Sequence, residues 1–193
     1  YQYVPAPMTA FEGIHKLPPA SVMVVEADGS KRMETYWSLA RPEKSLPRPV
    51  SEIEGELRDR FDAAVKRRLI SDVPLGAFLS GGIDSASVVA SMAHISSEPI
   101  KTFTIGFEEP AFDERRYAKL VSDRYGTDHY EFIVSPDAIS VLPKLVWHYG
   151  EPFADSSAIP TFHLSELTRR HVTVALNGDG GDENFLGYPR YVG

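Results

Sequence analysis

The sequence predicts an α/β protein in which helices cover both faces of a parallel sheet, preceded by a short β segment. Three observations support this fold class. From residue 51 onward, β-prone runs alternate with amphipathic segments, the pattern of strand–helix units in a parallel sheet. Two glycine-rich loops each follow one of these runs. Residues 1–48 differ from the rest in being rich in proline and poor in helical patterns.

The N-terminal stretch predicts a β-hairpin followed by a linker. Two strand-like runs, 21–26 and 32–37, flank Asp28-Gly29, a dipeptide that favours tight hairpin turns. The prolines between positions 42 and 49 indicate an extended connection.

A helix is expected from Ser51, with that residue as N-cap and Glu54 completing a capping box. Apolar residues then recur every four positions, which predicts one buried stripe. The stripe consists of Ile53, Leu57, Phe61, Val65 and Leu69.

Alternating units follow this helix. The expected strands cover 73–79, 101–107, 129–134 and 172–176, and the expected helices cover about 84–95, 113–125, 136–149 and 160–170. The helix over 113–125 should stop at Gly126, because glycine readily adopts the left-handed conformation that ends helices. Ligands of such sheets bind at the carboxyl ends of the strands, where both glycine-rich loops are expected.

Composition excludes several classes of function. A net charge of −7 argues against nucleic-acid binding, and the basic run 66–68 is interpreted as a solvated helix face. The absence of cysteine excludes a disulfide framework, a thiolate metal site and a cysteine nucleophile in this chain. No apolar run approaches the roughly 20 residues that span a bilayer, so a cytoplasmic protein without membrane contact is expected. Because the chain starts at Tyr1 and stops at Gly193 just after a motif, we expect a fragment of a longer protein.

The first glycine-rich loop, residues 79–85, reads L-S-G-G-I-D-S. A strand, a glycine turn and a helix N-terminus in this order aim backbone N–H groups and the positive end of a helix dipole at one point, which suits phosphate. Ser80 and Ser85 add hydroxyl donors, and Asp84 adds a carboxylate that could bind a divalent metal. The alternative is a tight turn that happens to contain serines. The loop is neither a Walker A motif nor a dinucleotide fingerprint.

The second loop, residues 177–183, packs three carboxylates into a glycine-rich turn. Carboxylates this close repel one another unless a cation or hydrogen-bond donors compensate. One interpretation is a solvated acidic turn in which Asp182 caps the next helix. Beside the first loop, a Mg²⁺ ion shared by Asp84 and Asp182 becomes the better interpretation, since magnesium favours a few carboxylates with phosphate oxygens and water.

Four motifs in register carry a resemblance to a known family. They are L-S-G-G-I-D-S, F-T-I-G-F, E-P-F-A-D-S-S-A-I-P and G-D-G-G-D-E-N-F-L-G-Y-P-R-Y. They resemble the synthetase domain of bacterial glutamine-hydrolysing asparagine synthetases, which belong to the N-type ATP pyrophosphatases and have the adenine nucleotide α hydrolase-like PP-loop fold. The opening Y-V-P-A-P…F-E-G-I-H-K-L-P-P resembles the end of that family's glutaminase domain. The resemblance thus implies a glutaminase tail and linker over 1–48 and the N-terminal part of the synthetase domain over 49–193.

The resemblance also implies roles for individual residues. The ATP-binding set is Leu79, Ser80, Gly81, Gly82, Asp84, Ser85, Ile105, Asn177 and Gly178, with Leu79 and Ile105 at the adenosine and the residues of 80–85 at the β,γ-pyrophosphate. Asp84 and Asp182 would hold Mg²⁺. Asp179 would lie near the acyl-adenylate and the incoming ammonia, so that Asp179 and Asp84 are the catalytic candidates. Glu151, Asp155 and Ser157 lie in the loop expected to face the amino-acid substrate.

The implied reaction is ATP-dependent amide formation. Aspartate would be adenylated to β-aspartyl-AMP with release of pyrophosphate, and ammonia from glutamine, supplied by a glutaminase domain of the same parent chain, would convert it to asparagine. One alternative is a related amidotransferase or a β-lactam synthetase-like cyclase acting on another carboxylate; the other is a non-catalytic nucleotide-binding remnant. Oligomeric state stays open, a homodimer included.

Some positions depart from the family's pattern. Asn177 stands where serine is common, and Gly150 stands where aspartate often precedes E-P-F. The family's N-terminal cysteine and a downstream lysine that neutralises pyrophosphate are not in this chain. The fragment is therefore expected to contain the ATP cradle without the whole enzyme.

Overall fold

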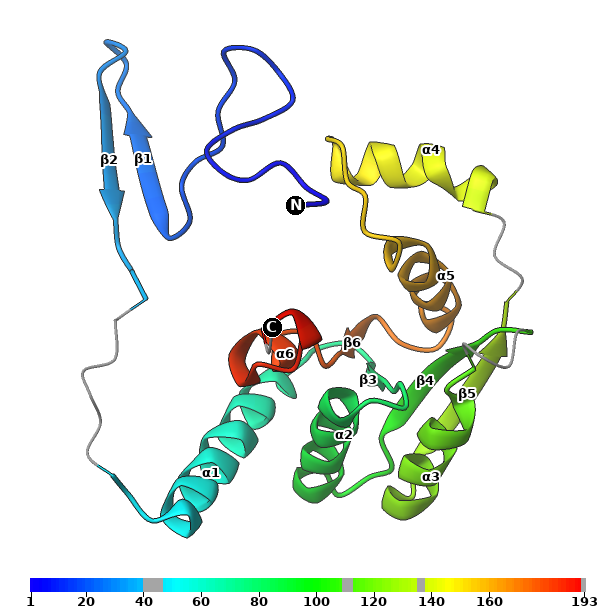
Figure 1. The fold of residues 1–193 in the computed structure, drawn as a ribbon. Coiled ribbons are helices and arrows are strands. Elements are labelled where there is room, and N and C mark those ends of the chain that lie inside the picture. The colour runs from blue at the N-terminus through cyan, green and yellow to red at the C-terminus, as the bar shows by residue number, and fades with distance from the viewer. Residues whose placement is uncertain (40–46, 109–112, 135–137, 192–193) are drawn as a thin grey trace. The chain divides into compact units, whose positions relative to one another are not determined.

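The computed structural model describes residues 1–39, 47–108, 113–134 and 138–191. The chain divides into two compact units. One comprises residues 1–47 and 137–158, and the other comprises residues 48–136 and 159–193. Figure 1 shows the helices and strands of both.

The larger unit is built on a four-stranded parallel sheet in the order β5-β4-β3-β6 (Figure 1). Its strands are β3 (Leu75–Phe78), β4 (Lys101–Gly106), β5 (Asp128–Ile133) and β6 (Val174–Leu176). Its helices are α1 (Val50–Arg68), α2 (Ile83–Ile95), α3 (Arg115–Tyr125), α5 (Ala158–Thr168), α6 (Gly181–Phe185) and the 3₁₀ turn η2 (Pro189–Tyr191). The predicted parallel α/β class is confirmed.

The order of the strands creates a switch point beside β3. The chain runs from β3 through α2 to β4 and through α3 to β5, always in one direction across the sheet. It then returns to place β6 on the other side of β3, with Ala77 opposite Leu176. The carboxyl ends of β3 and β6 are therefore neighbours, although they are about a hundred residues apart in sequence. Crevices at such points are where open α/β sheets bind ligands.

Apolar side chains fill both faces of this sheet. On one face, Ala77 and Leu79 pack against residues of α1, α2 and α3, with Val89 and Met92 fully buried. On the other face, the Phe103 ring stacks on Tyr130 at 5.2 Å and approaches His171, which follows α5. Figure 1 shows α5 on the side of the strands opposite to α2 and α3. Helices thus lie on both faces, as the sequence predicts.

The predicted N-cap of α1 is wrong by two residues. The helix begins at Val50, its N-cap position is Pro49, and no side chain caps it. Pro49 has φ −56°, already suited to a helix start, so Ser51 lies inside the first turn rather than before it. The Arg48 guanidinium supports this turn instead through ion pairs with Glu52 and Glu56 at 2.8 and 2.7 Å.

The predicted stripe of α1 is buried only in its C-terminal half. Val65 is 6% exposed, whereas Ile53 and Leu57 are 47% and 44% exposed. An α-helix has 3.6 residues per turn, so positions spaced by four rotate by about 40° at each step. Only the part from Phe61 to Leu69 packs against the core cluster.

In its described residues, the smaller unit contains the hairpin of β1 and β2 and the helix α4. Strand β1 (Ser21–Val25) pairs antiparallel with β2 (Lys31–Thr35), and Gly29 turns the chain with φ 83°. The hairpin predicted around Asp28-Gly29 is confirmed, with the Asp28 carboxylate accepting the Ser30 N–H at 2.9 Å. Helix α4 (Ala138–Tyr149) contains Pro143 and ends before Gly150, which has φ 67°.

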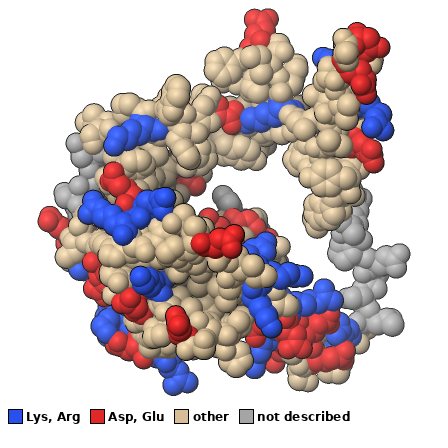
Figure 2. All heavy atoms as spheres, turned by 180° about the vertical axis from the view of Figure 1, so that it is seen from behind, with Lys and Arg blue, Asp and Glu red and all other residues tan. Residues whose placement is uncertain are grey.

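The described surface mixes charges of both signs. Figure 2 shows Lys and Arg interspersed with Asp and Glu over the visible face, in a chain of net charge −7. None of the described helices is long and apolar enough to cross a membrane.

Candidate nucleotide site

The glycine-rich loop starts from a buried anchor at the end of β3. Leu79 is 1% exposed, and its N–H donates to the Phe103 carbonyl at 2.9 Å. Its own carbonyl accepts a hydrogen bond from the Thr104 hydroxyl, inside the sheet. Ile105, the other residue assigned to adenosine, is half-buried one position further along β4. The two therefore lie at the carboxyl ends of adjacent strands.

Two serines hold the loop in shape. The Ser85 hydroxyl accepts the Ser80 N–H at 3.1 Å and lies 2.8 Å from the Ser80 hydroxyl, which in turn accepts the Gly82 N–H at 3.2 Å. Ser85 is 6% exposed. Its hydroxyl thus serves the internal hydrogen bonding of the loop, while Gly82 forms the N-cap of α2.

The acidic loop after β6 is a folded turn with its own hydrogen bonds. Asn177 brackets Asp179, donating from Nδ2 to Asp179 Oδ2 at 2.6 Å and accepting the Asp179 N–H at 3.2 Å. Gly180 adopts φ 96° at the start of α6, and Asn184 donates to its carbonyl at 2.6 Å. Asn177 thus orients the Asp179 carboxylate, a task that serine, with one hydroxyl, would perform with fewer contacts.

The two loops meet through glycines that leave no room for a side chain. A Cβ on Gly178 would lie 2.7 Å from the Ser85 nitrogen, and one on Gly181 would lie 2.3 Å from Asp84 Cγ. The Asp84 carboxylate therefore rests directly on the backbone of the acidic turn. The glycine-rich loop and the acidic turn, which the sequence motifs only suggested as neighbours, are thus in contact.

Asp182 does not cap the next helix, so that part of the alternative is wrong. It is the second residue of α6, the N-cap position is Gly180, and no side chain caps the helix. The Asp182 carboxylate lies instead beside Gly187, where a Cβ would collide with Oδ1. A carboxylate before a helical run is a common signal for a helix start, which is why Asp182 was a candidate cap, but the observed N-cap lies two residues earlier, at Gly180.

The three residues assigned to the amino-acid substrate belong to the smaller unit. There, Glu151 forms an ion pair with Lys16 at 2.5 Å, and Lys16 also donates to the Val4 carbonyl. The Asp155 carboxylate accepts the Ser157 N–H at 2.9 Å. In the structure both carboxylates thus have partners within the smaller unit: Lys16 for Glu151 and the Ser157 N–H for Asp155.

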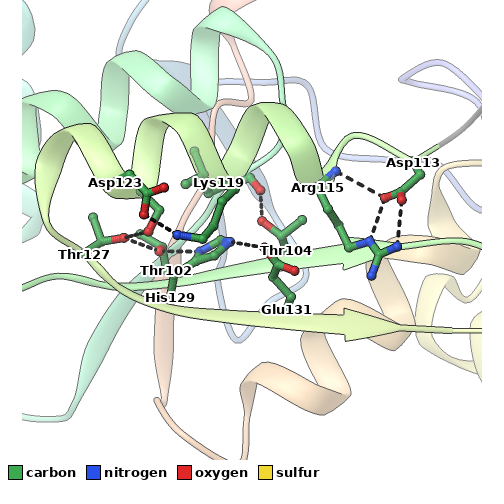
Figure 3. Close-up of polar contacts among 11 residues, drawn as sticks. Thr102, Thr104, Asp113, Arg115, Lys119, Asp123, Thr127, His129 and Glu131 are labelled. Carbon is green, nitrogen blue, oxygen red and sulfur yellow. Dashed lines mark hydrogen bonds and ion pairs between the residues drawn. The ribbon is translucent and has the colours of Figure 1, made fainter. Parts of the chain in front are cut away.

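The L-S-G-G-I-D-S motif does not predict one hydrogen bond that its loop makes, the bond between Gly81 and Glu114. The Gly81 N–H donates to Glu114 Oε2 at 3.2 Å. Glu114 stands 33 positions later in the chain, at the N-cap of α3. The next residue, Arg115, is held by a two-pronged ion pair with Asp113, at 2.8 and 2.7 Å (Figure 3). Those hydrogen bonds raise the pKa of Arg115 and lower the pKa of Asp113.

An open groove of about 1220 Å³ adjoins the two loops. Asp84, Asn177 and Asp179 line one part of it, and Leu57, Arg58 and Phe61 of α1 line another. The half-exposed stripe of α1 is thus a wall of this groove. The four-residue spacing predicted that Leu57 and Phe61 belong to a buried stripe, because spacing alone cannot separate a buried face from a groove wall.

The fold and the site define a class of protein: a parallel α/β sheet that presents a glycine-rich loop and an acidic turn side by side at its switch point. A family described as asparagine synthase matches residues 56–192. The chain belongs to the asparagine synthase family, and the resemblance read from its motifs is confirmed.

Curated relatives align with nearly the whole chain. It is 38% identical to asparagine synthetase [glutamine-hydrolyzing] 1 of Bacillus subtilis (strain 168) over 99% of this chain and 30% of that protein. It is 39% identical to putative asparagine synthetase [glutamine-hydrolyzing] 2 of Methanocaldococcus jannaschii, over 98% and 37%. It is 31% identical to amidase chyE of Penicillium rubens, over 95% and 30%. The chain thus spans about a third of the length of these relatives.

Among solved structures, the chain resembles an NH3-dependent NAD synthetase from Campylobacter jejuni. The likeness has a TM-score of 0.44 and 16% sequence identity, and it covers 74% of this chain and 62% of that one.

Proposed function

We propose that this chain is the ATP-binding part of a glutamine-hydrolysing asparagine synthetase. The side-chain carboxylate of aspartate attacks the α-phosphorus of ATP, the bond to the β-phosphate oxygen breaks, and pyrophosphate leaves. Ammonia then attacks the carbonyl carbon of β-aspartyl-AMP, and AMP leaves with formation of asparagine. The observation that carries the proposal is the contact of Asp84 with Gly181 at the switch point, in a chain of the asparagine synthase family.

The residues of the site have distinct tasks in this proposal. The loop residues Ser80, Gly81 and Gly82 bind the phosphates with backbone donors and the N-terminal end of α2, which favour the negative charge that develops on the leaving pyrophosphate. Leu79 and Ile105 contact the adenosine.

In the same proposal, Asn177 and Gly178 line the nucleotide site, and Asp179 faces the acyl-adenylate and the incoming ammonia. The hydrogen bonds between Asn177 and Asp179 support that role, because they fix the direction of the carboxylate.

In this proposal Asp84, which lines the groove at the two loops, would hold a magnesium ion together with Asp182. In the described ranges, no group of three or more His, Cys, Asp or Glu side chains is arranged to hold a metal. Magnesium needs no such group, since it usually takes one or two carboxylates and completes its shell with phosphate oxygens and water. When bound, the ion would neutralise charge on the pyrophosphate.

The proposal extends to the parent protein. Residues 1–48 would be the tail of a glutaminase domain with its linker, residues 49–193 the first part of the synthetase domain, and the glutaminase domain the source of ammonia. The names of the bacterial and archaeal relatives, glutamine-hydrolyzing asparagine synthetases, support this arrangement. A cytoplasmic location would follow, because ATP and free aspartate are cytoplasmic metabolites.

ATP–pyrophosphate exchange in the full-length parent tests the proposal. We expect exchange that requires aspartate and Mg²⁺, with glutamate, one methylene longer, as the matched control that gives little. Exchange that requires a different acid would refute the asparagine assignment. Failure of every acid to support exchange would leave a nucleotide-binding module.

A second candidate function is the amidation or cyclisation of another carboxylate. The relatives of the chain include proteins named amidases, such as amidase chyE, at 31% identity over 95% of the chain. The phosphate loop and the acidic turn would serve either reaction, because both begin with attack of a carboxylate on ATP. The identity of the acid that supports exchange separates the two.

A further inference from the structure

The Gly81 N–H, one of the expected phosphate donors, already has an anionic partner. It donates to Glu114 Oε2 at 3.2 Å. A carboxylate oxygen and a phosphate oxygen offer the same chemistry to a backbone N–H, namely a negatively charged acceptor. Only one of them can take this donor at a time.

Glu114 differs from the other acceptors at the loop in its charge. The N–H groups of Ser80 and Gly82 donate to serine hydroxyls, which are neutral. Glu114 brings a full negative charge to the end of the loop that opens α2, where the helix dipole favours anions. The N-terminal end of α2 thus attracts the Glu114 carboxylate in the same way that it would attract a phosphate.

The backbone of Glu114 is held by hydrogen bonds, whereas its side chain can rotate away from the Gly81 N–H. Its carbonyl accepts the N–H groups of Tyr117 and Ala118 at 3.0 and 3.2 Å, as the start of α3. The first turn of α3 also packs closely on the loop, since a Cβ on Gly81 would lie 2.8 Å from Tyr117 Cβ. Rotation of the Glu114 side chain would free the Gly81 N–H without moving either element.

We propose that Glu114 is an internal anion that holds the Gly81 N–H until the pyrophosphate group of the nucleotide displaces it. This inference rests on the proposed function, which assigns the loop to phosphate. Glu114 thereby lowers the affinity of the loop for free phosphates and keeps its backbone in the binding arrangement when no nucleotide is present.

Calorimetric titration of the full-length parent with Mg²⁺–pyrophosphate tests the displacement. Glu114→Gln keeps an acceptor of the same shape and removes the charge. We expect it to bind pyrophosphate about fivefold more tightly, the ratio that corresponds to exchanging a charged for a neutral hydrogen bond at one donor. Glu98→Gln is the matched control, because it removes the same charge from an exposed position just before β4, at the amino end of the strands and away from the loop. Its affinity should equal that of the wild type.

Equal or weaker binding by Glu114→Gln would overturn the inference, since a carboxylate that merely supports the loop cannot improve affinity when it is removed. The Gly81 amide gives a second readout. Its hydrogen exchange in the absence of ligand should quicken in Glu114→Gln, and the added Mg²⁺–pyrophosphate should slow it equally in both proteins. Protection by pyrophosphate in the wild type without any effect of the substitution would also contradict displacement.

The outcomes separate this inference from the proposed function. Tighter pyrophosphate binding by Glu114→Gln without aspartate-dependent exchange would support the inference about Glu114 and refute the proposed asparagine synthesis. Aspartate-dependent exchange with an unchanged pyrophosphate affinity of Glu114→Gln would support the proposed function and refute the inference about Glu114. Absence of pyrophosphate binding in every variant would overturn the inference, because no phosphate would then compete at Gly81.

Discussion

At the scale of single residues, the site depends on the contact between Asp84 and the backbone of Gly181. A Cβ at Gly181 would lie within 2.3 to 2.6 Å of three atoms of the Asp84 carboxyl group. The carboxylate can therefore rest on the acidic turn only because position 181 carries no side chain. This makes Asp84 and Gly181 the two sharpest tests of the site.

Asp84→Asn should weaken the binding of Mg²⁺–pyrophosphate by more than about tenfold, because the substitution removes a proposed metal ligand without changing shape. Calorimetry on the full-length protein measures this. Asp72→Asn, an exposed change of the same kind before β3, is the control and should bind as the wild type does. Unchanged affinity in Asp84→Asn would remove Asp84 from the metal role.

Gly181→Ala should also weaken pyrophosphate binding, since the new methyl group must push the Asp84 carboxylate out of its place. Gly55→Ala is the matched control. It lies in α1 with no atom within 4 Å of the added Cβ, so it should raise stability by about 0.5–1 kcal/mol and leave binding alone. Binding of wild-type strength by Gly181→Ala would show that the contact is not needed.

Also at the scale of single residues, the sequence motifs identify the residues of the two loops but not every residue that contacts them. Asp84 and Asp182 were identifiable because each stands in a glycine-rich loop that follows an expected strand, and the second loop holds three carboxylates. Glu114 was not, since it starts a helix one full strand later and carries no motif of its own. Its contact exists only because the first turn of α3 packs on Gly81.

At the scale of elements, α1 has two different halves. Val65 is buried against α2 and the sheet, whereas Ile53 near the start of the helix is 47% exposed. Four-residue spacing marks both positions equally, so the sequence pattern cannot distinguish them. Their burial follows from which part of α1 reaches the core.

Val65→Ala should reduce the free energy of unfolding by about 2 kcal/mol, since it leaves a cavity in the core. Ile53→Ala should cost less than about 1 kcal/mol, because its side chain keeps contact with solvent in the folded state. Urea denaturation of the two variants measures the difference. A cost at Ile53 as large as that at Val65 would mean that another part of the parent protein covers this end of α1.

His129 of β5 makes stability dependent on pH. Burial lowers the pKa of His129 below its ordinary value of 6.5, against the opposing effect of Glu131. Its Nδ1 lies 2.8 Å from the Thr102 hydroxyl, and its Nε2 lies 3.5 Å from Glu131 Oε1, with Lys119 and Asp123 of α3 also nearby (Figure 3). Because the unfolded chain takes up the proton at a higher pH than the folded protein, the stability from neutral His129 is complete above pH 6.5 and falls as the pH drops toward its folded pKa.

Urea unfolding between about pH 5 and 8 checks this expectation. The loss of stability below pH 6.5 should be smaller in His129→Gln than in the wild type, because the variant has no imidazole to protonate at this position. The same substitution at the exposed His94 is the control. An identical pH dependence in His129→Gln and the wild type would contradict the assignment.

At the scale of the whole molecule, contacts between distant segments define each unit. In the smaller unit, the pair of Lys16 and Glu151 joins residues 135 positions apart at 2.5 Å, with 30% and 23% of the side chains exposed. In the larger unit, β3 and β6 bring together the glycine-rich loop and the acidic turn. Neither pairing is visible in a local pattern.

A double-mutant cycle of Lys16→Met and Glu151→Gln should give a coupling free energy of about 1 kcal/mol in urea unfolding, because the ion pair is partly shielded from water. The exposed pair of Arg60 and Glu56 on α1 is the control, and its coupling should stay below about 0.5 kcal/mol. Equal coupling in the two cycles would mean that partial shielding from water does not strengthen the Lys16–Glu151 pair.

The sequence by itself determined the local features: the alternation of strands and helices, the hairpin at Asp28-Gly29, the helix stop at Gly126 with φ 63°, and membership of the asparagine synthase family. These follow from period, turn chemistry and motif, which act over a few residues. The tertiary structure alone decided that β6 lies beside β3, that Asp84 rests on Gly181 and that Glu114 reaches Gly81. Strand pairing and loop contacts depend on which distant surfaces pack together, and no local periodicity specifies that choice.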